Sequence, residues 1–130
     1  MNNLATFGYE LHAQVFTSGD IEAMLTWIPS LEGAAGTRNL LEIPQCRELA
    51  RDTRITKLVE DDLGPNSIPI RAILFDKSAA ANWNLGWHQD KKIAVKRHIE
   101  TDGFSAWSEK EGVIHCQPPA TILEASLAVR

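Results

Sequence analysis

Trp87-His88-Gln89-Asp90 is the stretch that decides how this chain is expected to fold and act. In an extended strand, residues two positions apart project from the same face, so His88 and Asp90 would point into one cavity. An imidazole and a carboxylate, joined by a second histidine, form the facial triad that holds non-haem iron and leaves three positions open. The tetrapeptide therefore predicts a strand that carries two iron ligands, His88 and Asp90.

The residues upstream of this stretch supply the expected walls and charges of the same pocket. Trp83 and Trp87 are close enough in sequence to line one side of the metal. Arg71 and Lys77 have the same strand parity, so both side chains can point toward the pocket. Cationic side chains beside iron would suit a dicarboxylate cosubstrate, because they pair with its carboxylates.

Each of these assignments has a structural alternative. A His-x-Asp tripeptide is short enough to arise by chance. His88 can instead be a core histidine and Asp90 a turn or cap residue. Arg71 and Lys77 can simply flank a buried strand and reach solvent. His115, next to Cys116, is a further candidate for the third iron ligand.

Composition restricts the class of protein. The chain has 130 residues, of which 44% are hydrophobic and 23% charged, as in one ordinary globular domain. Its net charge of −4 disfavours a nucleic-acid or anionic-membrane surface. The sequence has no apolar run of membrane-spanning length and no signal-peptide pattern, so a cytoplasmic location is expected. Two cysteines are too few for a disulfide framework.

Residues 1–66 are expected to be mainly helical. Signals for helix boundaries are clear at Pro44, which suits a first helical turn, and at Gly64-Pro65, which ends a helix. N-cap chemistry is available at Ser18-Gly19-Asp20. The elements predicted for this half are a strand at 11–16 and helices at 21–28, from Pro44 onward, and at 53–63.

Residues 67–130 are expected to be strand-rich with one long loop. β-Branched and apolar residues after Pro69 are typical of a buried strand. Glycines, prolines and polar residues dominate 101–119, which predicts an irregular insertion. The elements predicted for this half are strands at 70–75, 83–90 and 93–95, a helix from Pro118-Pro119 through Glu124, and a strand beginning at 127.

Several of these segments resemble bacterial members of the phytanoyl-CoA dioxygenase (PhyH) family. The likeness is strongest in Arg71-Ala-Ile-Leu-Phe-Asp-Lys77, Asn82-Trp-Asn-Leu-Gly-Trp-His-Gln-Asp90 and Ile93-Ala-Val-Lys96. It continues through Gly103-Phe104, Trp107, Lys110-Glu-Gly-Val-Ile-His115, Gln117-Pro-Pro119 and Leu123-Glu124, and upstream in Gly36-Thr-Arg-Asn-Leu-Leu41 and Leu63-Gly-Pro65.

The resemblance implies an iron(II)- and 2-oxoglutarate-dependent dioxygenase that hydroxylates a small molecule. The implied fold class is α+β, with N-terminal helices packed on part of a double-stranded β-helix, a jelly-roll or cupin-like barrel. His88 and Asp90 fall on the first two iron ligands. Arg71 and Lys77 fall where the cosubstrate is contacted, and Arg130 falls on a strand that lines the same pocket.

The chain differs from the family in the second half of the family's barrel. There the strand that starts near Leu127 continues into strands that carry the distal histidine and the arginine for 2-oxoglutarate. We therefore expect residues 1–130 to be a single partial, truncated domain with impaired activity. Its unpaired sheet edges would favour self-association or a complementing chain.

Two functions of other classes stay open. The chain can be a non-catalytic binding or interaction module that another polypeptide completes. It can also be a metal-dependent hydrolase, with zinc held by His88, Asp90 and His115.

Overall fold

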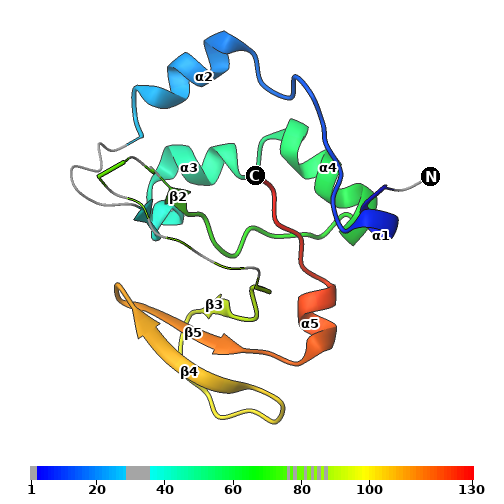
Figure 1. The fold of residues 1–130 in the computed structure, drawn as a ribbon, viewed down its shortest axis with the longest axis vertical. Coiled ribbons are helices and arrows are strands. Elements are labelled where there is room, and N and C mark those ends of the chain that lie inside the picture. The colour runs from blue at the N-terminus through cyan, green and yellow to red at the C-terminus, as the bar shows by residue number, and fades with distance from the viewer. Residues whose placement is uncertain are drawn as a thin grey trace.

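The structure is a computed structural model with helices mainly in the first half of the chain and strands mainly in the second (Figure 1). The small three-stranded sheet lies at one end of the long axis and α2 at the other. The mixed helix-and-strand class expected from the sequence is confirmed. The structure describes residues 3–28, 36–75, 77, 79–80, 82, 84, 86 and 88–130.

The helices follow the local signals in the sequence closely. The helix from Pro44 and the helix over 53–63 are both confirmed, since Pro44 begins α3 and Gly64 ends α4 with a φ of 86°. The helix after Pro118-Pro119 is also confirmed. The bounds are Asn3–Phe7 (α1), Ser18–Leu25 (α2), Leu40–Glu42 (η1, a 3₁₀ turn), Pro44–Leu49 (α3), Thr53–Leu63 (α4) and Ala120–Glu124 (α5).

A reciprocal cap begins α2 slightly earlier than predicted. Thr17 is the N-cap, and its hydroxyl accepts a hydrogen bond from the Asp20 backbone N–H at 3.2 Å. The Thr17 N–H donates to the Asp20 carboxylate at 2.8 Å. Two backbone donors are thus satisfied at once, which fixes the start of the helix.

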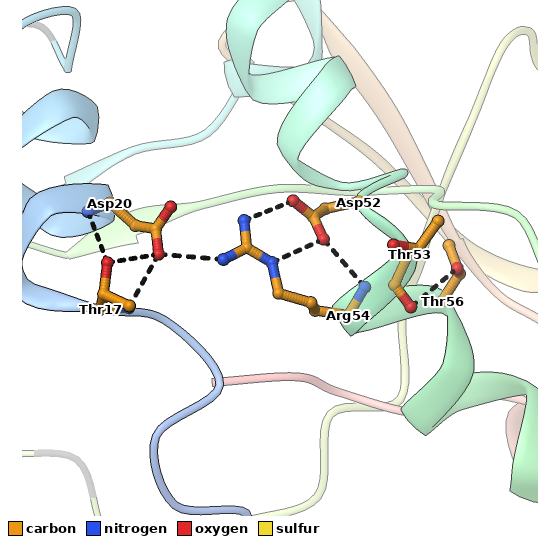
Figure 2. A network of polar contacts seen from close by, with 6 residues as sticks. All are labelled: Thr17, Asp20, Asp52, Thr53, Arg54 and Thr56. Carbon is orange, nitrogen blue, oxygen red and sulfur yellow. Dashed lines mark hydrogen bonds and ion pairs between the residues drawn. The ribbon is translucent and has the colours of Figure 1, made fainter.

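Arg54 joins the starts of α2 and α4 (Figure 2). Its guanidinium donates to the Asp20 carboxylate at 2.9 Å and to both oxygens of Asp52 at 2.7 and 2.9 Å. The guanidinium carbon also lies 4.4 Å from the centre of the Phe16 ring, a cation–π contact. One side chain therefore ties two helices and the segment before α2 together.

This network predicts a residue-specific pH dependence. Hydrogen bonds from Arg54 lower the pKa of Asp52 from 3.8 to about 2. Because the folded-state pKa is depressed, the stabilising contact is fully present above pH 3.8 and is lost as the pH falls through about 2. In Arg54→Met we expect the Asp52 pKa to rise toward 3.8 but to stay below it, because the backbone N–H of residue 54 still donates to the carboxylate; NMR titration of the carboxyl carbon measures it. Arg51→Met should leave it near 2; an unchanged Asp52 titration in Arg54→Met would contradict the network.

The strands form two small antiparallel sheets. Gly36–Thr37 (β1) pairs with Leu74–Phe75 (β2). In the second sheet Val113–Gln117 (β5) lies between Ile93–Val95 (β3) and Ser105–Lys110 (β4). Neither sheet is closed in the described part of the chain.

The β4–β5 hairpin corrects the prediction of an irregular insertion over 101–119. Its two turn residues, Glu111 and Gly112, both have positive φ angles, 53° and 76°. That backbone matches the twist of a two-residue hairpin turn. A glutamate rarely adopts it, so Glu111 is a weak turn signal.

Four predicted strands differ from the structure. The strand over 11–16 is absent, because Gln14 has a φ of 59° and the segment turns. The strand over 70–75 is reduced to β2 and a single bridge between Asn39 and Ala72. No strand forms at the described positions within 83–90 or at 127–130, and the strand over 93–95 is confirmed as β3.

Little apolar surface is removed from water. Among the described residues, the buried hydrophobic side chains are Leu40, Cys46 and Cys116. The chain exposes 10204 Å², whereas a compact monomer of 14.4 kDa exposes about 6,800 Å². Within the described ranges, no helix has both the length and the apolar character needed to cross a bilayer.

Candidate functional site

His88 and Asp90 lie close together, but no strand carries them, and His88 is not among the described residues that line the cavity beside Asp90. His88 Nε2 lies 3.7 Å from Asp90 Oδ1, and both side chains are about half exposed. The other ring nitrogen, Nδ1, lies 3.0 Å from the Gly86 carbonyl oxygen. A carbonyl only accepts, so Nδ1 carries the proton of the neutral ring and Nε2 presents a lone pair. Two acceptors therefore face each other, and a cation between them would satisfy both.

The spacing of this pair suits two ligands of one metal ion. Nitrogen and oxygen ligands bind such ions at roughly 2.1 Å, which puts neighbouring donors about 3.0 Å apart and opposite donors about 4.2 Å apart. The 3.7 Å between Nε2 and Oδ1 is wider than the spacing of adjacent ligands, so the two half-exposed side chains would have to close slightly around the ion. A ligating histidine also commonly donates its second N–H to a backbone carbonyl, as His88 does to Gly86.

The third ligand is not present among the described residues. No three His, Cys, Asp or Glu side chains there lie close enough together to hold a metal ion. The predicted zinc set of His88, Asp90 and His115 is therefore wrong, and so is His115 as third iron ligand. The chain's described residues fit iron as a two-ligand site and no more.

The pairing of a histidine with a carboxylate two residues away is not unique to His88. His98 Nε2 lies 2.7 Å from Glu100, and His12 Nε2 lies 3.6 Å from Glu10. Among the described contacts, neither of these histidines has its ring held by a backbone carbonyl. That anchor, and the cavity beside Asp90, distinguish the His88 pair.

A cavity of about 180 Å³ adjoins Asp90. It brings together two predicted site residues, Asp90 and Arg71, from segments nearly twenty positions apart. Five cations surround a single carboxylate and one histidine. Its described lining residues are Arg38, Arg71, Asp90, Lys91, Lys92, Lys110 and His115.

Four of these cations are not among the site residues predicted from the sequence. Lys91 and Lys92 directly follow Asp90, so their proximity was available as a signal. Lys110 lies in the segment 101–119 that is predicted to be irregular, although it ends β4. Arg38 reaches the cavity because its guanidinium pairs with the Glu111 carboxylate in the hairpin turn.

An ion pair and a hydrogen bond hold the two sides of the cavity together. Besides the Arg38–Glu111 ion pair, the Asn39 side-chain amide donates to the Glu111 carbonyl at 2.9 Å. The segment before η1 is thus fastened to the tip of the β4–β5 hairpin. This contact explains how residues more than 70 positions apart come to share one cavity.

The structure does not bring the other predicted cosubstrate contacts to this cavity. Lys77 and Arg130 are not among the described residues that line the cavity, so their contact with a cosubstrate stays a prediction. Arg130 is exposed and outside any strand. Trp83 and Trp87, the predicted pocket walls, lie outside the described residues.

His115 lines the cavity, and its neighbour Cys116 is buried in β5. His115 is only 5% exposed, and its Nδ1 donates to the Val113 carbonyl at 2.9 Å. Cys116 is fully buried, and burial raises the pKa of its thiol. Because the thiolate is the metal-binding form, this cysteine is a poor ligand.

Comparison with known proteins identifies no relative. No protein-family model matches the chain. No curated protein matches it, and no solved structure does either.

Proposed function

We propose that this chain supplies the His-x-Asp part of an iron(II)- and 2-oxoglutarate-dependent dioxygenase of the phytanoyl-CoA dioxygenase type. The observation that supports it best is the pair of lone pairs on His88 Nε2 and Asp90 Oδ1, 3.7 Å apart, with the ring held by Gly86. We also propose that β3, β4 and β5 belong to a jelly-roll sheet with helices packed outside it.

In this proposal the side chains of the protein bind the metal ion and orient the cosubstrate. His88 and Asp90 would hold iron(II), which when bound supplies the oxidation chemistry. Arg71, beside Asp90 in the cavity, would pair with a carboxylate of 2-oxoglutarate, since guanidinium and carboxylate match in geometry. The substrate class is a small molecule. With two protein ligands, the ion is held weakly and turnover is expected to be low.

Anaerobic equilibrium dialysis of iron(II) against metal-stripped protein tests the proposal. We expect one ion per chain, bound more tightly with 2-oxoglutarate present, because its 2-oxo acid group adds two ligands. Succinate is the matched control, since it has two carboxylates but no 2-oxo group to chelate. The proposal fails if the protein retains no iron, or if 2-oxoglutarate and succinate act alike.

A second candidate function is an interaction module that a second copy of the chain completes. We propose it because the exposed area of 10204 Å² exceeds that of a compact monomer by roughly 3,400 Å². A standard interface needs only about 800 Å² from each partner. Several large apolar side chains are well exposed and would supply its core: Phe7, Tyr9, Leu11, Leu25 and Ile68.

A further inference from the structure

Positive charge is concentrated in the cavity beside Asp90 to an extent that the chain as a whole does not share. Five of its described lining residues are cationic, while the protein has a net charge of −4. Like charges held together repel one another unless an anion lies among them. The cavity therefore favours a negatively charged occupant.

Most of these cations have no carboxylate partner. Arg38 pairs with Glu111. Arg71, Lys91 and Lys110 form no ion pair with any residue in the described ranges. Three positive groups at one cavity thus have the capacity to bind a multivalent anion.

Lys92 is held in place for such a contact. Its ammonium donates to the Ala106 carbonyl at 2.6 Å and to the Ser108 hydroxyl at 2.9 Å. An ammonium has three N–H donors, so one donor is left for a ligand. A side chain fixed in this way loses less conformational entropy on binding than a free lysine does.

His115 gives the cavity a hydrogen-bond acceptor as well. Its Nδ1 proton is donated to the Val113 carbonyl, so Nε2 of the neutral ring is the nitrogen left to accept. Hydrogen phosphate carries both acceptor oxygens for the cations and a P–OH donor for this nitrogen. Sulfate lacks the donor at neutral pH, so it would leave Nε2 facing another acceptor.

The volume of the cavity is enough to enclose a small anionic group. Its volume of about 180 Å³ corresponds to about six water molecules at roughly 30 Å³ each. Pockets for drug-sized ligands begin near 300 Å³. A single phosphate ion and a few waters fit this space.

We propose that the cavity lined by Arg71, Lys92, Lys110 and His115 is a binding site for hydrogen phosphate. The cavity shares Arg71 and Asp90 with the proposed dioxygenase site, and binding of phosphate without metal tests it separately. The cations would bind the charged oxygens, and His115 would accept the proton of the remaining one.

Calorimetric titration of the metal-stripped full chain with inorganic phosphate tests the site. The titration is done near neutral pH, at low ionic strength and with a chelator present, so that neither salt screening nor iron affects the result. We expect phosphate to bind one per chain and at least about tenfold more tightly than sulfate, because only hydrogen phosphate can donate a hydrogen bond to His115 Nε2. Equal binding of phosphate and sulfate would overturn the proposal.

Two charge-removing variants locate the site. Arg71→Gln and Lys110→Gln should each weaken phosphate binding at least about tenfold, since each removes a charged hydrogen-bond donor. Both side chains are exposed, so the fold should survive, as circular dichroism will show. Lys57→Gln on α4 removes the same charge from an exposed position outside the cavity and should leave the affinity unchanged. Equal weakening by all three variants would indicate diffuse charge attraction and overturn the site.

Discussion

His88→Ala is expected to weaken iron(II) binding at least about 100-fold. Loss of an outer contact around a metal ligand costs 10–100-fold in affinity, so loss of one of two ligands should cost more. Asp90→Asn should have a similar effect, because the amide keeps the shape of the side chain and loses its charge. Both variants should fold normally, because both side chains are about half exposed.

The chain contains a matched control for this experiment. His98 also pairs with a carboxylate two residues away, Glu100, at 2.7 Å. It lacks the backbone anchor seen at His88 among the described contacts. His98→Ala should therefore leave iron affinity unchanged in anaerobic dialysis, and an equal loss in both alanine variants would remove the reason for placing iron at His88.

The second large expected effect is self-association of the chain. The apolar surface left exposed should drive formation of a dimer at micromolar concentrations, because burial of roughly 800 Å² per partner forms a stable interface. Leu11 and Ile68 are 85% and 76% exposed, and a charge there opposes burial against a second copy. We expect Leu11→Asp and Ile68→Asp each to raise the dimer dissociation constant at least about tenfold, measured by sedimentation velocity over a concentration series.

Gln45→Asp is the control for these variants. Gln45 is exposed on α3, so the substitution adds the same charge where no apolar surface is lost. The dimer should persist in it. A wild-type chain that sediments as a monomer throughout the series would exclude the second candidate function.

The helices could be predicted because their signals are local. Pro44 and Gly64 fix the start of α3 and the end of α4, and each acts through its own backbone. The β4–β5 hairpin could not be predicted in the same way. Its turn places Glu111 in a left-handed conformation that the residue type does not favour.

The candidate site could be predicted only in part, for a similar reason. Spacing alone places His88 opposite Asp90, because two residues of extended chain bring them to one side. The cationic cavity depends on a long-range contact, the Arg38–Glu111 pair, which joins distant segments. Nothing in the local sequence of either segment indicates that they meet.

The most direct measurement of the central claim is an anaerobic iron(II) titration of isotope-labelled protein followed by NMR. A bound paramagnetic ion broadens the signals of the nuclei nearest to it. We expect the signals of Gly86, His88 and Asp90 to disappear at substoichiometric iron, while those of His98 and Glu100 remain sharp. Broadening that begins at His98 and Glu100, or that affects no residue first, would contradict it.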